Sequence, residues 1–289
     1  MRPWKATANG PPIHAMTCDV EDYFQVSAFS QHVDRASWEK LECRIPRNID
    51  RILERLFESG AKATFFTLGW VAREHPEVIR RIVAAGHEIA SHGMDHTRVW
   101  QQSAGEFRGD ALTARRLLED VAGVPVVGYR AASWSIDSRT PWAHEMLAEA
   151  GYKYSSSIYP ISHDHFGMPE APTSPFVVDE SEILEIPASV VRLLGRNVPA
   201  AGGGYFRLFP LQFSIWLIKR IQMAGNSPFV FYFHPWEMDP DQPKVKGVPA
   251  KARFRHYLNL RKFDSRLQAL LEHFKWGRID DIFLNGDAS

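Results

Sequence analysis

Two histidines four residues apart are the strongest chemical signal in the chain. His92 and His96 belong to the segment Ser91-His92-Gly93-Met94-Asp95-His96. On a helical turn, side chains at this spacing lie on one face, so both imidazoles can reach one metal ion. Gly93 stands where the HExxH motif of zincins has its catalytic Glu, so this is not a zincin site. The alternative is an unrelated pair of surface histidines.

An acidic cluster can complete such a site. Asp19, Glu21 and Asp22 follow the apolar run 13–18 and precede two aromatic residues. Three close carboxylates repel one another unless a cation or a proton separates them. One carboxylate with two imidazoles leaves coordination positions open for water and substrate, and a second carboxylate could act as general base. A solvated acidic loop is the simpler alternative.

Two further polar residues each follow a predicted strand. Arg130 comes after 126–129 and could hold the base through a bidentate pair, although a structural salt bridge is equally compatible with the sequence. His234 comes after the hydrophobic run 229–233 and could protonate a leaving group. A lone histidine in this position is more often structural, so its assignment depends on the rest of the set.

The elements that position these residues alternate between strand and helix. This alternation predicts a parallel sheet with crossover helices, open or closed into a barrel. Ligands bind at the carboxyl ends of the strands in such folds, which is where all the residues above would converge. Strands are expected at 13–18, 63–68, 87–90, 126–129, 152–155, 183–186, 190–194 and 229–233, and helices at 47–59, 76–85, 103–122, 140–150, 210–224 and 253–274.

Composition limits the class of protein. The 289 residues carry 34 Lys+Arg against 34 Asp+Glu, so the formal net charge is zero, which argues against a nucleic-acid partner. Two cysteines exclude a disulfide framework. No segment resembles a signal peptide or a membrane span, so we expect a cytoplasmic protein. The sequence does not indicate an oligomeric state.

Together the motifs resemble the polysaccharide deacetylase (NodB-homology) superfamily, carbohydrate esterase family four, over about residues 13 to 235. Other segments resemble the branch found in exopolysaccharide biosynthesis loci, among them Gly202-Gly203-Gly204-Tyr205-Phe206-Arg207 and His234-Pro235-Trp236-Glu237. The superfamily motifs are Thr17-Cys18-Asp19-Val20-Glu21-Asp22, Ser91-His92-Gly93-Met94-Asp95-His96, Tyr129-Arg130-Ala131-Ala132-Ser133 and Phe231-Tyr232-Phe233-His234.

The resemblance implies a distorted (β/α) barrel of parallel strands in one domain, 1–289, with a core at about 13–235 and a C-terminal helical extension at 236–289. It implies a divalent-metal amidohydrolase, with Zn²⁺ the expected ion, that removes acetyl groups from N-acetylhexosamine units of a glycan. Site roles carry over by position: Asp19 as catalytic base, Asp22 or Glu21 as metal carboxylate, His92 and His96 as metal imidazoles, Arg130 to orient the base, and His234 as catalytic acid.

Three departures from the family pattern affect these roles. Val20 and Glu21 separate two acids that are usually adjacent, so strand alternation favours Glu21 as the ligand whereas residue type favours Asp22. Ala132 replaces the usual Pro. The segment Ser155-Ser156-Ser157 replaces the Asp-rich motif that normally orients the acid, which leaves His234 without an evident carboxylate partner.

Substrate contacts are predicted from exposed aromatic residues that could stack on sugar rings. A backbone N–H near Ala131 is expected to hold the oxyanion. Rival functions are a metal-independent, allantoinase-like amidohydrolase, a glycoside hydrolase that uses Asp19 and Asp22, and a catalytically inactive glycan-binding protein. The candidate stacking residues are Trp134, Tyr159, Tyr205 and Trp236.

Overall fold

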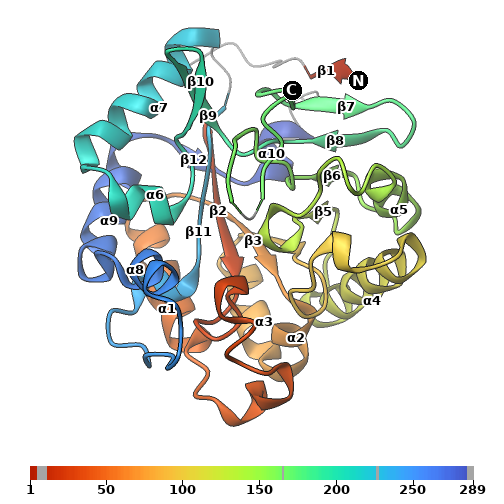
Figure 1. The fold of residues 1–289 in the computed structure, drawn as a ribbon, viewed down its shortest axis with the longest axis vertical. Coiled ribbons are helices and arrows are strands. Elements are labelled where there is room, and N and C mark those ends of the chain that lie inside the picture. Colours follow the sequence, from red (N-terminus) through yellow and green to blue (C-terminus); the bar gives the residue numbers. More distant parts are fainter. Residues whose placement is uncertain (5–11, 165, 226–227, 285–289) are drawn as a thin grey trace.

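A largely parallel sheet forms the centre of the protein. The computed structural model describes residues 1–4, 12–164, 166–225 and 228–284. The hydrogen-bonded strand order is β1-β7-β8-β6-β5-β4-β3-β2-β11, and β12 also pairs with β2 (Figure 1). The strands of this sheet are β1 (Arg2–Pro3), β2 (His14–Val20), β3 (Thr64–Thr67), β4 (Glu88–Ser91), β5 (Gly128–Tyr129), β6 (Tyr154–Ser155), β7 (Phe176–Val178), β8 (Ile183–Glu185), β11 (Val230–Phe233) and β12 (Trp276–Gly277).

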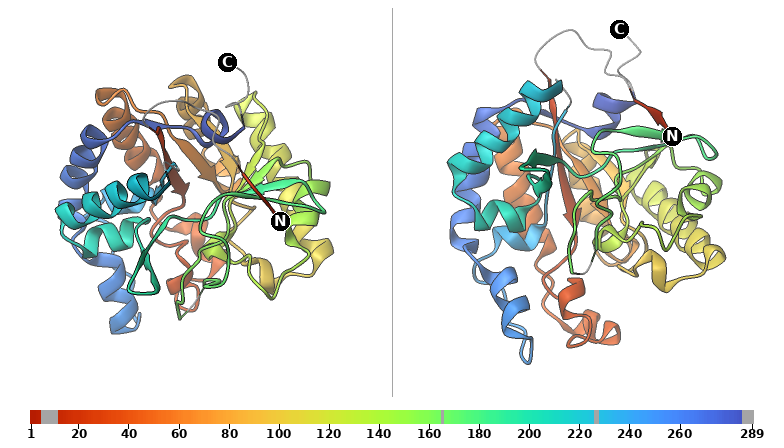
Figure 2. Two further views of the ribbon diagram at one scale, coloured as in Figure 1. Left: turned by 90° about the horizontal axis from the view of Figure 1, so that it is seen from above. Right: turned by 45° about the horizontal axis from the view of Figure 1, so that its top comes forward.

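The helices lie outside the strands (Figure 2). Helix α4 shows the expected sequence signals: Ser103 and Glu106 form a capping box at its start, and Gly123 ends it in a left-handed conformation. The helices are α1 (Ile45–Glu58), α2 (Gly69–Glu74), α3 (Pro76–Ala84), α4 (Ala104–Ala122), α5 (Ala143–Glu149), α6 (Gly203–Leu208), α7 (Leu211–Gly225), α8 (Ala250–Tyr257), α9 (Phe263–His273) and α10 (Ile279–Phe283).

Strand β2 leads into the acidic cluster and pairs with β3, β11 and β12. All seven of its residues are buried, as expected for a parallel strand covered on both faces. Its neighbours β3 and β11 run parallel to it, and its partners in register include Phe233 opposite Cys18. The sheet continues in register through Thr67 opposite Ser91 and Ser91 opposite Tyr129. The residues that follow these positions therefore emerge at the same edge of the sheet.

The predicted α/β fold with parallel strands is confirmed in its main part. Two differences concern the periphery. Strand β7 pairs antiparallel with β1 and β8, and the predicted strand 190–194 belongs to a separate hairpin of β9 (Val190–Leu193) and β10 (Arg196–Pro199). Because Asn259 adopts a left-handed conformation (φ 52°), the predicted helix 253–274 is split into α8 and α9.

Within the described ranges, none of the helices has both the length and the hydrophobicity that crossing a bilayer requires.

Candidate metal and catalytic centre

Three side chains at the carboxyl edge of the sheet could hold a metal ion. One ligand atom from each of Glu21, His92 and His96 lies within 4.8 Å of the others. Glu21 Oε2 is buried and lies 2.9 Å from His96 Nε2, yet it has no hydrogen bond of acceptable geometry among the described residues. A cation between these atoms would satisfy that oxygen, so the donor set fits a divalent metal.

The protonation states of these residues also suit a cation. Burial lowers the pKa of His92 to about 4, so its imidazole is neutral at pH 7. Its Nδ1–H donates to the carbonyl oxygen of Arg130 at 2.8 Å, which leaves the Nε2 lone pair free for a metal. Burial alone would raise the pKa of Glu21, but the neighbouring histidines, His96 foremost, lower it to about 2.

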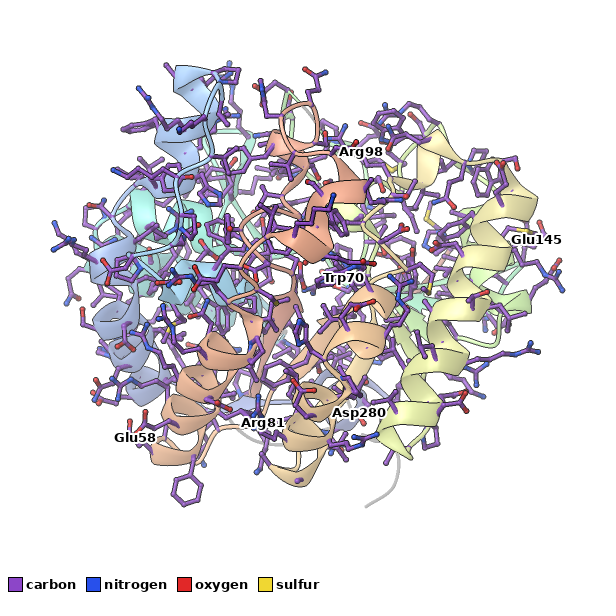
Figure 3. All side chains as sticks on the ribbon, turned by 90° about the horizontal axis from the view of Figure 1, so that it is seen from below. Glu58, Trp70, Arg81, Arg98, Glu145 and Asp280 are labelled. Carbon is purple, nitrogen blue, oxygen red and sulfur yellow. The ribbon has the colours of Figure 1, made fainter. Side chains whose placement is uncertain are left out.

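The two histidines meet on a loop, so the prediction of a helical turn was wrong. Their ring centroids are 5.2 Å apart. Gly93 (φ 77°) and His96 (φ 61°) both have left-handed backbones, and these turn the chain back on itself after β4. Figure 3 shows the molecule from below, with Trp70 and Arg98 marking the segments that follow β3 and β4.

Asp22, the other predicted carboxylate ligand, does not join the cluster. Its Oδ2 accepts backbone hydrogen bonds from Arg44 and Ile45 at the start of α1, and its Oδ1 accepts one from Tyr23. These bonds turn the carboxylate toward the helix N-terminus and away from the histidines. Of the two alternatives left open by the sequence, the structure brings Glu21 to the histidines.

Asp19 and Arg130 form a buried ion pair. Arg130 Nη1 lies 2.6 Å from Asp19 Oδ1, and the Arg130 side chain has no exposed surface. The pair has one contact instead of the predicted two. The other guanidinium nitrogens bind Ser156, with Nε donating to its carbonyl oxygen and Nη2 to its hydroxyl. The segment Ser155-Ser156-Ser157 therefore anchors Arg130 through Ser156.

His234 has a carboxylate partner that the sequence analysis missed. Its Nδ1 lies 3.1 Å from Glu237 Oε2, and its Nε2 faces Glu21 Oε1 at 3.5 Å. Burial alone would lower the pKa of His234, but Glu237 and Glu21 outweigh it and raise the pKa to about 9. The signal was the Glu three residues after the histidine in a turn opened by Pro235, a capping-box spacing.

Glu237 is itself held by Arg207. Arg207 Nε donates to Glu237 Oε1 at 2.7 Å, and both side chains are almost completely buried. A Cβ atom at Gly203 would lie 2.0 Å from Glu237 Oε2, so only glycine leaves room for the carboxylate there. The Gly-rich segment around Gly203 therefore leaves the space that the carboxylate partner of His234 occupies.

Three of the four aromatic residues predicted to stack on sugars are buried, so that prediction was wrong for Trp134, Tyr159 and Trp236. The Arg130 guanidinium carbon lies 4.8 Å from the ring centroid of Trp134. Trp236 stacks on His234 with the two ring centroids 5.1 Å apart. Tyr205 is half-buried. The Ala131 N–H, the predicted oxyanion donor, donates to Ser157 Oγ at 2.9 Å and is not free.

Two family models match consecutive parts of this chain. The polysaccharide deacetylase family model matches residues 36–155, and a domain of unknown function (DUF3473) matches residues 156–284. Residues 36–155 therefore belong to the polysaccharide deacetylase family, which is the part of the chain that the family model covers. The deacetylase match contains His92, His96 and Arg130, whereas His234 and Glu237 lie in the segment of unknown function.

Relatives with assigned activities match parts of the chain. A chitooligosaccharide deacetylase of Bradyrhizobium sp. (strain ANU 289) is 32% identical over 97 residues, which cover 34% of this chain and 42% of that protein. A peptidoglycan deacetylase of Helicobacter pylori is 30% identical over 110 residues, covering 38% and 36%. The matches thus span less than half of either relative.

Solved structures share the fold. A Mycobacterium smegmatis protein assigned to the polysaccharide deacetylases superposes with a TM-score of 0.55 at 23% identity, covering 95% of both chains. PuuE allantoinase superposes with a TM-score of 0.55 at 18% identity, covering 84% of this chain and 72% of that one.

Proposed function

We propose that this chain is a metal-dependent N-deacetylase that hydrolyses the acetamide of N-acetylhexosamine units in a polysaccharide or its precursor. One observation carries the proposal: a buried carboxylate oxygen of Glu21 lies 2.9 Å from an imidazole nitrogen of His96 and near His92, close to an Arg-held acid and a Glu-held histidine. The deacetylases of Bradyrhizobium and Helicobacter pylori, similar over part of the chain, support the reaction type.

The metal would be held by Glu21, His92 and His96, with Zn²⁺ as the ion we propose. A bound divalent cation supplies a Lewis acid for the acetamide carbonyl and lowers the pKa of water at the site. The Asp19 charge partly opposes the effect of burial on the pKa of His92, which indicates that the two side chains are close. Arg130 joins them through its guanidinium on Asp19 and its carbonyl oxygen on His92.

Asp19 and His234 divide the proton transfers. Asp19 is the base that takes a proton from the attacking water, and the contact with Arg130 fixes its position. His234 is the acid that gives a proton to the departing amine from Nε2. Its Nδ1–H donates to Glu237, so the ring is oriented with Nε2 toward Glu21. Acetate and a free amino sugar are the products.

We place the substrate in exopolysaccharide biosynthesis. The segments around Gly203 and His234 that resemble this branch hold the Glu237–His234 pair, so the branch-specific residues are part of the proposed site. A glycoside hydrolase that uses Asp19 and Asp22 as its carboxylate pair is not supported, because Asp22 binds the backbone at the start of α1.

Acetate release tests the proposal. The full chain, loaded with zinc, is incubated with N-acetylglucosamine oligomers, and acetate is measured before and after chelator treatment and after zinc is restored. We expect acetate that disappears with the chelator and returns with zinc. Acetate release that the chelator leaves unchanged would refute metal dependence, and no release from any N-acetylated glycan would refute the deacetylase.

A further inference from the structure

The zero net charge of the chain conceals one strongly basic segment. Residues 242–262 contain seven Lys+Arg and no Asp or Glu. This segment comprises a loop and helix α8, which lies at the same end of the molecule as the arrowhead of β2 (Figure 1). Two of its cations, Lys251 and Arg255, pair with Asp164. Its other cations leave an excess of positive charge near the carboxyl edge of the sheet.

A hollow lies within this segment. It measures about 460 Å³ and contains no acidic residue in its lining. Lys244 and Arg253 are exposed, and neither has an ion-pair partner among the described residues. Phe254 is 60% exposed beside them. The lining residues are Lys244, Ala250, Arg253, Phe254, Tyr257 and Leu258.

The walls of the hollow are held in place. Tyr257 accepts a hydrogen bond from the Val245 N–H at 3.0 Å, which ties the loop to α8. Gln242 contacts His256 Nε2 at 2.7 Å on the buried side. The carbonyl oxygens of His256 and Leu258 bind the same Arg207 guanidinium that holds Glu237.

A chain of aromatic rings connects the hollow to the proposed acid. His234 stacks on Trp236, Trp236 stacks on His256, and His256 packs edge-on against Tyr257. The successive centroid separations are 5.1, 4.1 and 4.6 Å. The hollow is therefore three ring contacts from the proposed acid, and a glycan that reaches both would follow the surface around the buried rings of Trp236 and His256.

We infer that this hollow binds an acidic sugar unit of the glycan whose acetamide occupies the catalytic centre. A carboxylate on the sugar would pair with Lys244 and Arg253, and the apolar face of its ring would pack on Phe254. A membrane surface fits less well, because the single exposed aromatic side chain of Phe254 is much less than the apolar face that a helix buries in a bilayer interface. The inference takes from the proposed function only that the ligand is a glycan.

Binding measured by calorimetry tests the inference without requiring turnover. The zinc-loaded full chain is titrated at low salt with a hexamer of galacturonic acid and with a neutral N-acetylglucosamine hexamer. We expect the acidic hexamer to bind, and the double variant Lys244→Gln/Arg253→Gln to weaken its Kd by about tenfold, since two charged contacts are lost. Phe254→Ala should weaken the Kd independently of charge.

A double variant of exposed cations elsewhere, Arg196→Gln/Lys219→Gln, is the matched control and should leave the Kd unchanged. Equal weakening in both double variants, or no binding of the acidic hexamer, would overturn the inference. It would also be overturned if the hollow variants lost binding only to anionic lipid vesicles. If the chain releases acetate but does not bind the acidic hexamer, only this inference is refuted. If the hexamer binds through the hollow but no acetate is released, only the proposed deacetylase activity is refuted.

Discussion

Glu237 Oε2 lies 3.1 Å from His234 Nδ1, three residues away along the same turn. The same oxygen also accepts the His234 backbone N–H at 3.0 Å. The carboxylate thus fixes both the backbone and the ring of the proposed acid. The carboxylate partner of the proposed acid therefore comes from the adjacent turn and not from the segment Ser155-Ser156-Ser157.

Replacing Glu237 by Gln should impair the acid. Glu237 helps to raise the pKa of His234 to about 9, so His234 remains protonated up to that pH and activity should fall above it. In Glu237→Gln the pKa falls, and the alkaline limb of kcat should move to lower pH. At pH 8 we expect kcat to drop by about 10- to 100-fold with a smaller change in KM.

The pH profile of kcat checks this, with the exposed Glu180→Gln as control. An alkaline limb that stays in place in Glu237→Gln would show that Glu237 does not set the protonation of His234.

Glycine substitutions test the fit of Glu237. In Gly203→Ala the new methyl group would meet Glu237 Oε2 at 2.0 Å, so we expect a loss of about 1–3 kcal/mol in the free energy of unfolding and reduced activity. A methyl group at the neighbouring Gly204 would meet no atom within 4 Å, so Gly204→Ala should be neutral or slightly stabilising. Denaturant unfolding of both variants checks this, and equal effects would contradict the packing account.

Glu21→Gln and Asp22→Asn separate the two adjacent acids. Glu21→Gln removes the charged ligand, so bound metal should be lost and activity should fall at least about a hundredfold. Asp22→Asn should retain the metal but cost about 1–2 kcal/mol of stability, since one of its oxygens caps the start of α1. Metal content by mass spectrometry distinguishes them, and the reverse pattern would make Asp22 the ligand.

His14 should make stability depend on pH below neutrality. Burial lowers its pKa from 6.5 to about 4, and its Nδ1 accepts the Phe229 N–H. Between pH 6.5 and 4 the unfolded chain binds a proton at His14 that the folded chain does not. The contribution of His14 to stability therefore falls by about 3 kcal/mol as the pH falls through this range. His14→Asn should be less stable at pH 7 but should show a shallower slope.

Unfolding free energies measured across this pH range check the slope, with the exposed His273→Asn as reference. If His14→Asn retained the full slope, the titrating group would lie elsewhere.

The sequence predicted most of the sheet and the set of polar residues at its edge. This prediction depends only on neighbouring residues, because an apolar run precedes each of the polar residues Asp19, His92, Arg130 and His234. The orientation of each side chain is not local: Glu21 and Asp22 differ because the start of α1, about twenty residues on, binds one of them.

The burial of the aromatic residues could not be predicted from the sequence either. Trp134 and Trp236 look like sugar-stacking residues by type, but they enclose Arg130 and His234. Which face of a ring is covered depends on segments far apart in the chain, such as α8 packing beside Trp236 through His256. The Glu237 partner, in contrast, could have been found from its three-residue spacing.

The most direct measurement is acetate release from an N-acetylglucosamine oligomer by zinc-loaded wild type, Glu21→Gln and Asp22→Asn under identical conditions. We expect zinc-dependent acetate release by wild type and Asp22→Asn, and a near-complete loss in Glu21→Gln. Acetate release by Glu21→Gln at the wild-type rate would contradict the proposed metal centre.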